Sequence, residues 1–391
     1  MTHHIMPTYA RLPVTFKEGK GCWLTDDQGN RYLDALSGIA VCGLGHAHPA
    51  VTEAICSQAS KLVHTSNLYS IDLQEKLADK LAALSCMDNL FFCNSGAEAN
   101  EAAIKIARLY GHNRSLDVPK IIVMENSFHG RTLSTLSATG NPKVQEGFTP
   151  LVEGFIRVPY NDVEAIKLAA QNHSDIVAIL VEPVQGESGV RIPKTDYLNQ
   201  LREICDQQQW LLMLDEVQTG IGRSGKFFAY QHNNILPDVC TLAKGLGNGV
   251  PIGACMAQGI ASTILTAGTH GSTFGGNPLV CSAALAVLET MESQSLPERA
   301  KLVGNKIVAN FKEKLADNKQ ILSIRNKGLM IGIELAKPCT ELVSIALENK
   351  LLINVASGNT IRLLPPLVIS DEEAVLLVEK LSLLIENFTK E

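Results

Sequence analysis

The sequence lacks the features that would assign it to nucleic acid or to a membrane. Its 391 residues carry a formal net charge of −6, spread without blocks, so there is neither a basic stripe for nucleic acid nor a polybasic membrane anchor. No apolar run approaches the roughly 18 residues of a spanning helix. The first residues resemble neither a signal peptide nor an Arg-rich transit helix. We therefore expect a cytoplasmic protein that binds neither nucleic acid nor a membrane.

Paired cysteines and clustered metal ligands are missing as well. The ten cysteines include no C-x-x-C pair, and most of them, such as Cys93 and Cys240, stand in apolar surroundings. This is typical of reduced cysteines in a core. The histidines, among them His46, His48 and His129, come without a convincing set of neighbouring ligands, so we expect no bound metal.

What the chain does contain is enough apolar material for a large core, because 46 % of its residues are hydrophobic, and its length suggests two or three domains. Two short apolar runs end in charged residues: residues 211–214 precede Asp215, and residues 239–243 precede Lys244 and a glycine cluster. Both have the character of buried strands in a parallel sheet. Ligands bind beyond the carboxyl ends of such strands, so Asp215 and Lys244 are expected to face one crevice.

An ordinary ion pair would also explain a lysine and a carboxylate in one crevice. The glycines after Lys244, however, let the backbone approach a ligand closely, and a desolvated lysine becomes a nucleophile able to form a Schiff base. Pyridoxal phosphate (PLP) enzymes need such a lysine and an acidic residue that keeps the pyridine nitrogen protonated. Asp215 suits this role, because a neighbouring carboxylate typically shifts such a pKa by about 1–3 units.

The string LDEVQTGIGRSG from Leu214 to Gly225, followed by Ala243-Lys244-Gly245, resembles the signature of class III PLP-dependent aminotransferases. The similarity runs from about Tyr9 to the C-terminal helix, and within the class it is greatest to enzymes that act on acetylornithine. It implies the type I aminotransferase fold, an α/β architecture with a large domain around a mostly parallel central sheet and a smaller α+β domain. It also implies a homodimer with shared active sites and a position for Gln218 near the phenolic oxygen of the cofactor.

The pattern of the remaining chain suggests where these parts begin and end. Residues 9–41 alternate in short runs between turns, which predicts a β-meander, and we expect the arm 1–48 to pack with the C-terminal domain. Residues 49–279 are assigned to the large PLP-binding domain and residues 280–391 to the small one.

Within the small domain, residues 325–335 are expected to form one half-buried strand and residues 360–366 another. Ser370 and Glu373 predict a capping box for the last helix.

A strand expected at residues 89–93 leads into Ser95, Gly96 and Ala97 at the start of a helix. The free N–H groups and the positive dipole end of a helix bind phosphate readily, so these three residues are candidates to cradle the cofactor phosphate. A plain helix cap is the alternative. Enzymes of the resembled class commonly carry Thr or Ser at the position of Ala97, so one hydroxyl contact would be missing here.

Further candidates follow the strand expected at residues 120–124. Phe128 would stack on the cofactor ring, with core packing as the alternative. Arg131 is a candidate for a substrate carboxylate, because guanidinium binds carboxylate bidentately, with a surface arginine as the alternative.

The resemblance supplies the remaining site residues. It implies that Glu187 pairs with Arg362 and frees it only when a dicarboxylic substrate arrives, although Glu187 could also be a solvated loop carboxylate. It further implies that Ser272 and Thr273 reach the site of the partner subunit, where Thr273 would contact the cofactor phosphate.

The predicted reaction moves the terminal amino group of N2-acetyl-L-ornithine to 2-oxoglutarate and yields N-acetyl-L-glutamate 5-semialdehyde and L-glutamate, a step of arginine biosynthesis. Ornithine, succinyldiaminopimelate or 4-aminobutyrate as the amino donor stay open. A non-catalytic nucleotide-binding α/β protein is the alternative from another class. Its G-x-G-x-x-G fingerprint is not found, because the glycines at 245, 247 and 249 have the wrong spacing.

Overall fold

The apolar run before Asp215 forms a strand in the middle of the central sheet. The computed structural model describes residues 4–390. The strands of this sheet are β4 (Asn89–Cys93), β5 (Lys120–Met124), β6 (Phe155–Val158), β7 (Ile176–Val181), β8 (Leu211–Asp215), β9 (Val239–Leu242) and β10 (Gly253–Ala257). Their order is β4-β10-β9-β8-β7-β5-β6. All neighbours pair in parallel except β10, which is antiparallel to β4 and β9, so the predicted fold class is confirmed.

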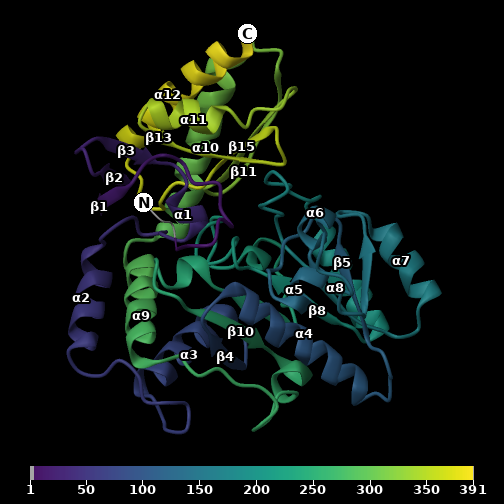
Figure 1. Cartoon of the computed structure of the whole chain (residues 1–391). Coiled ribbons are helices and arrows are strands. Elements are labelled where there is room, and N and C mark those ends of the chain that lie inside the picture. The colour runs from purple at the N-terminus through teal and green to yellow at the C-terminus, as the bar shows by residue number, and fades with distance from the viewer. Residues whose placement is uncertain (1–3, 391) are drawn as a thin grey trace.

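Helices cover both faces of this sheet (Figure 1). The helices of this part of the chain are α2 (Pro49–Ala59), α3 (Asp72–Ser85), α4 (Gly96–His112), α5 (Leu133–Ala138), α6 (Pro142–Gln145), α7 (Val163–Asn172), α8 (Tyr197–Gln208) and α9 (Pro278–Ser293). Leu180 and Met213 pack with α4, whereas Ile179 and Leu212 pack with α8 on the opposite face. Because neither face meets water, β7 and β8 are continuous apolar runs.

Short 3-10 helices complete the large part of the chain: η1 (Ala229–His232), η2 (Lys244–Leu246) and η3 (Gly259–Thr263). None of the helices in residues 4–390 is long and apolar enough to cross a membrane.

The N-terminal meander predicted from residues 9–41 is present as β1 (Phe16–Lys20), β2 (Trp23–Asp26) and β3 (Arg31–Asp34), paired antiparallel. β3 also pairs in parallel with β13 (Leu351–Leu352). The purple N-terminal strands therefore lie beside the yellow C-terminal part in Figure 1. A short, irregular helix, α1 (Ser37–Ala40), follows the meander.

The C-terminal sheet has the order β11-β12-β15-β14. Its strands are β11 (Ile321–Lys327), β12 (Met330–Leu335), β14 (Asn354–Ala356) and β15 (Thr360–Leu363). The prediction of one half-buried strand over 325–335 is wrong, because the chain reverses at Gly328 (φ 59°) and forms a hairpin. Met330 packs on one side of β12 and Ile331 on the other, in separate clusters, so β12 is buried on both faces rather than alternating.

The remaining helices pack around this sheet and around β13. They are α10 (Leu296–Lys314), α11 (Leu342–Glu348) and α12 (Asp371–Lys390). The predicted capping box is confirmed, because Glu373 N donates to Ser370 Oγ and Ser370 N donates to Glu373 Oε2.

Candidate active site

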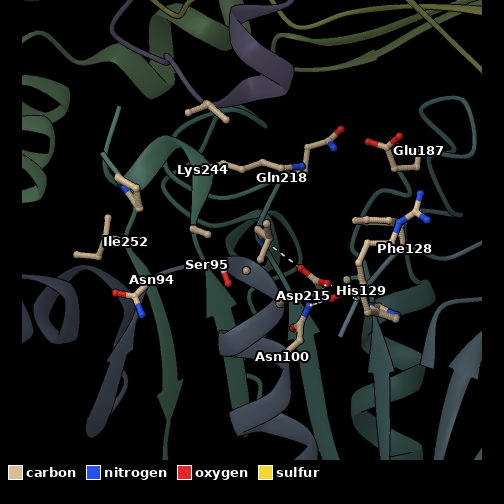
Figure 2. A pocket seen from close by; sticks show the side chains of 18 of the residues that line it. Asn94, Ser95, Asn100, Phe128, His129, Glu187, Asp215, Gln218, Lys244 and Ile252 are labelled. Carbon is tan, nitrogen blue, oxygen red and sulfur yellow. Dashed lines mark hydrogen bonds and ion pairs between the residues drawn. The ribbon is translucent and has the colours of Figure 1, made fainter. Parts of the chain in front are cut away.

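A cavity of about 390 Å³ lies where the carboxyl ends of the central strands meet (Figure 2). Asp215 is the last residue of β8, and Lys244 follows β9 by two residues. The predicted site residues that line this cavity are Ser95, Gly96, Ala97, Phe128, Arg131, Glu187, Asp215, Gln218 and Lys244. Residues at the carboxyl ends of several strands therefore line one site, which is where ligands bind in open α/β sheets.

Three predicted residues do not line this cavity. Arg362 is 1 % exposed and lies behind Glu187, which does line it. Ser272 Oγ accepts a hydrogen bond from Asn94 Nδ2 at 3.1 Å, and Thr273 is exposed. The structure thus leaves Ser272 and Thr273 outside the cavity of their own chain.

Asp215 is buried and held by a polar network. Its Oδ2 accepts a hydrogen bond from Asn100 Nδ2 at 2.7 Å and lies 2.8 Å from His129 Nδ1. Asn100 Nδ2 also donates to the carbonyl of His129 at 2.8 Å, and Asn100 Oδ1 accepts from Thr241 Oγ1 at 2.7 Å. With these partners fixed, the carboxylate of Asp215 has one orientation toward the cavity.

Sequence reasoning missed Asn100 and His129. His129 belongs to the same segment as Phe128 and Arg131, and the sequence pattern marks it only as a possible metal ligand. Asn100 stands on the buried face of α4 among alanines, and a polar residue there was the available signal, since buried polar side chains need partners.

Lys244 enters the cavity from the start of η2, and Figure 2 shows its side chain extending toward Gln218. Its backbone lies in the left-handed region with φ 42°, which is rare for a residue other than glycine and frequent at functional sites. Burial lowers the pKa of the Lys244 amine, and the negative charge of Glu187 opposes this effect. A lowered pKa is what a nucleophilic lysine requires.

Glu182 directly follows β7, and its side chain is buried. Burial raises the pKa of its carboxyl to about 8, the charge of Asp215 adds to this, and the backbone donors of Phe128 and Gly186 oppose it. Its Oε1 accepts from Phe128 N at 2.9 Å and its Oε2 from Gly186 N at 3.4 Å. Glu182 therefore ties together the two loops that carry Phe128 and Glu187.

This pKa predicts a pH dependence of stability. Since the ordinary pKa is 4.5 and the folded value about 8, between these values the folded chain keeps a proton that the unfolded chain has lost. The contribution of Glu182 to stability is therefore complete below pH 4.5 and declines as the pH rises to 8, by at most about 1.4 kcal/mol per pH unit. Glu182→Gln removes this decline.

Melting temperatures of the cofactor-free protein measured between pH 5 and 8 test the prediction. The wild type should lose stability more steeply than Glu182→Gln. Glu216, whose pKa burial raises to about 7, is present in both proteins and cancels in the comparison. Parallel curves would show that Glu182 is ionised in the folded protein.

The N-terminus of α4 faces the cavity and offers donors for an anion. Ser95 caps the helix, accepting from Glu98 N at 3.2 Å. Within residues 4–390, no hydrogen bond uses the backbone N–H groups of Gly96 or Ala97. A Cβ on Gly96 would lie 2.7 Å from Val217, so glycine lets the helix end approach the loop after β8.

These residues fit PLP. The helix end supplies free N–H groups for a phosphate, and the buried carboxylate of Asp215 suits a protonated ring nitrogen. Gln218 Oε1 is buried without a hydrogen-bond partner in residues 4–390, as expected of an acceptor whose donor belongs to a ligand.

An ion pair closes one side of the cavity. Arg362 Nη1 donates to Glu187 Oε1 at 2.6 Å, and Arg362 Nη2 donates to Asn354 Oδ1 at 2.8 Å. Burial disfavours the charge of Glu187, but the guanidinium of Arg362 outweighs burial and lowers the pKa of the carboxyl. Arg131, by contrast, is exposed at the rim, with its guanidinium 5.8 Å from the ring centre of Phe128.

Comparison with known proteins agrees with this geometry. The model of the aminotransferase class-III family matches residues 5–385. The chain is 58 % identical to the acetylornithine aminotransferase of Nitrosomonas europaea over 385 residues, 98 % of each protein. The ornithine aminotransferase from Toxoplasma gondii crystallized in the presence of oxidized glutathione has a TM-score of 0.95 at 35 % identity, covering 99 % of this chain and 93 % of that one. The acetylornithine aminotransferase from Elizabethkingia anophelis has a TM-score of 0.88 at 36 % identity, covering 98 % and 96 %.

The fold and the site together are those of a PLP-dependent transferase of amino groups. The chain belongs to the class-III aminotransferases.

Proposed function

We propose that this aminotransferase moves the terminal amino group of N2-acetyl-L-ornithine to 2-oxoglutarate, in arginine biosynthesis. The observation that carries the proposal is the pair of arginines in different states, Arg362 buried under Glu187 and Arg131 open at the rim. Such a site can accept a long acylated substrate and then a short dicarboxylate. The relatives named acetylornithine aminotransferase in Nitrosomonas europaea and Elizabethkingia anophelis support it.

The residues that would hold PLP follow from their chemistry. Ser95, Gly96 and Ala97 would bind its phosphate, and Phe128 would pack on its ring. Asp215 would keep the ring nitrogen protonated, and Gln218 would approach its phenolic oxygen. When bound, the cofactor supplies an aldehyde for amino groups and an electron sink for the carbanion formed at the substrate carbon.

Lys244 is proposed to anchor the cofactor and to move the proton. Burial lowers the pKa of its amine, which favours the neutral form of Nζ, and neutral Nζ can take a proton from the substrate carbon and return it. Asn100 and His129 hold Asp215 in place during this transfer. Glu182 holds Phe128 through its backbone N–H.

The two arginines sort the two substrates. Acetylornithine reacts at its distal amine, so its carboxylate lies far from the reacting carbon and meets Arg131. Glutamate reacts at its α-amine, so its α-carboxylate lies close to the reacting carbon and requires Arg362. Glu187 would cover Arg362 in the first half-reaction and withdraw in the second.

The assembly and the division of the chain are also proposals. We infer a homodimer in which Ser272 and Thr273 enter the partner's site, Thr273 at the cofactor phosphate, because neither lines the cavity of its own chain. Residues 1–48, 49–279 and 280–391 would act as arm, large domain and small domain. A cytoplasmic location suits these small, soluble substrates.

A donor panel tests the proposed substrate. Initial rates with acetylornithine, ornithine, succinyldiaminopimelate and 4-aminobutyrate, each with 2-oxoglutarate, give four values of kcat/KM. Acetylornithine should give the highest value. A value at least tenfold higher with another donor, equivalent to about 1.4 kcal/mol, would assign the enzyme to that donor.

Single half-reactions test the roles of the arginines. Removing one partner of a desolvated carboxylate–guanidinium pair costs about 2–5 kcal/mol, or roughly 30- to several-thousand-fold in rate. In stopped-flow experiments, Arg362→Ala should impair reaction with glutamate much more than reaction with acetylornithine. Arg131→Ala should impair acetylornithine at least as severely as glutamate. Equal damage to both half-reactions by Arg362→Ala would rule out the exchange of partners at Arg362.

A further inference from the structure

A row of residues crosses the C-terminal sheet beneath the loop that carries Glu187. Arg325 on β11 stands opposite Gly332 on β12, and Gly332 stands opposite Arg362 on β15. Directly opposed residues of antiparallel strands point to the same face. Two guanidinium groups therefore share one face of the sheet, separated by a residue that has no side chain.

The backbone of residues 189 and 190 lies over that gap. Arg325 Nη2 donates to the carbonyl of Gly189 at 2.6 Å, and Arg325 Nε donates to the carbonyl of Val190 at 2.9 Å. A Cβ on Gly332 would lie 3.1 Å from Val190 Cβ and 3.4 Å from Gly189 O. Because Gly332 has no side chain, the backbone of residues 189 and 190 can pack against β12 between the two arginines.

The loop of residues 187–190 has a strained backbone conformation, which it would leave if its contacts with the sheet were lost. Val190 has φ 52°, and a β-branched residue in the left-handed region is a genuine outlier. Its side chain is fully buried against Met330 and Leu364. Such strain persists only where the surrounding contacts hold it, and Arg325 binds the carbonyl of Val190 itself.

Arg325 is in turn fixed by its own sheet. Its Nη1 donates to Glu334 Oε2 at 2.6 Å and to Ser323 Oγ at 2.5 Å. The planar fork therefore points toward the loop from a rigid strand pair, and its loop contacts go to main-chain atoms. The contact of Arg362 goes instead to the side chain of Glu187, which another carboxylate can replace.

We propose that Arg325 is a positioning residue that fixes the backbone of residues 187–190, so that the side chain of Glu187 alone moves when Arg362 changes partner. The proposal rests on the exchange of partners described under the proposed function. Loss of the anchor lets the loop relax and draws the carboxylate of Glu187 away from Arg362. Acetylornithine can then place its own carboxylate on the uncovered Arg362, an unproductive position because its α-amine is acetylated.

The test compares Arg325→Met with Lys327→Met in the holoenzyme. Lys327 stands two residues further along β11 and donates no hydrogen bond to this loop in residues 4–390. Hydrogen exchange of a peptide covering residues 183–193 should be faster in Arg325→Met and unchanged in Lys327→Met. The ratio of half-reaction rates, acetylornithine over glutamate, should fall roughly 3- to 30-fold in Arg325→Met alone.

If hydrogen exchange of this peptide is unchanged in Arg325→Met, Arg325 does not anchor the loop. If hydrogen exchange is faster but the ratio of half-reaction rates is unchanged, the anchor has no effect on substrate choice. The exchange measurement reports the anchor by itself, whereas the Arg362→Ala half-reactions report the proposed function, so the two failures are distinguishable. If Arg325→Met does not fold, Arg325→Lys serves instead, because one ammonium group does not reproduce the fork that binds both carbonyls. Arg325→Lys should show faster hydrogen exchange of the loop and a lower ratio of half-reaction rates, both to a smaller extent than Arg325→Met. Hydrogen exchange equal to that of the wild type would contradict the role of Arg325 as an anchor.

Discussion

Replacing Lys244 with alanine is expected to lower turnover by several orders of magnitude and to leave the fold intact. Nζ of Lys244 donates no hydrogen bond to another residue within residues 4–390 and faces the cavity, so truncation breaks no hydrogen bond of the fold. The left-handed backbone at this position, φ 42°, is no worse for alanine than for lysine. What is lost is the nucleophile and the group that carries the proton, and general acid–base catalysis alone contributes about 10²–10⁴-fold.

Steady-state kinetics and thermal melts of Lys244→Ala check this result. Lys226→Ala, which removes an exposed lysine nearby in the sequence, is the matched control and should keep full activity. Retention of more than roughly a tenth of the wild-type turnover by Lys244→Ala would exclude a proton-transfer role, given the size of that contribution.

Asp215→Asn is expected to weaken catalysis more than cofactor binding. Asparagine keeps the shape of the side chain and removes its charge, so the ring nitrogen would lose the partner that keeps it protonated. The amide would also present a donor toward Asn100 and His129, which now approach Oδ2 at 2.7 and 2.8 Å. We expect kcat to fall roughly 10²–10³-fold, the usual size for one preorganised charge contact.

Cofactor affinity should change far less, because the N-terminus of α4 is untouched by the substitution. An absorbance titration with PLP measures that affinity beside kcat. Glu216→Gln is the control, because Glu216 accepts hydrogen bonds from the backbone N–H groups of Ala229 and Tyr230. This substitution should lower stability and leave the chemical step unchanged. Wild-type activity and an unchanged cofactor spectrum in Asp215→Asn would contradict the assigned role.

The parts of the site that the sequence predicted are those that follow from a local pattern. Asp215 and Lys244 each end a buried apolar run, and the carboxyl ends of parallel strands meet at one edge, so two local patterns place two residues together. The position of Ser95 also follows from a local pattern, in which a strand is followed directly by a helix. The structure has β4, the helix cap and α4 where that pattern predicts them.

The residues that the sequence did not reveal depend on contacts between distant segments. Asn100 and His129 meet Asp215 across 115 and 86 residues of chain, and neither has a local pattern that announces this contact. Arg325 is a similar case, because its partners Gly189 and Val190 lie 136 and 135 residues away. The hairpin at Gly328 differs from the single half-buried strand that the sequence predicts, because apolar residues of β12 pack on both of its faces, whereas a half-buried strand has them on one face only.

We propose that Lys244 carries the cofactor in the cavity that Asp215 lines. Borohydride reduction of the yellow holoenzyme, followed by proteolysis and mass mapping, tests it most directly, because reduction makes the link between lysine and cofactor permanent. We expect loss of the yellow colour and a phosphopyridoxyl mass on the peptide that contains Lys244. Labelling of a different lysine, or a colourless protein that gains no absorbance band with added PLP, would contradict it.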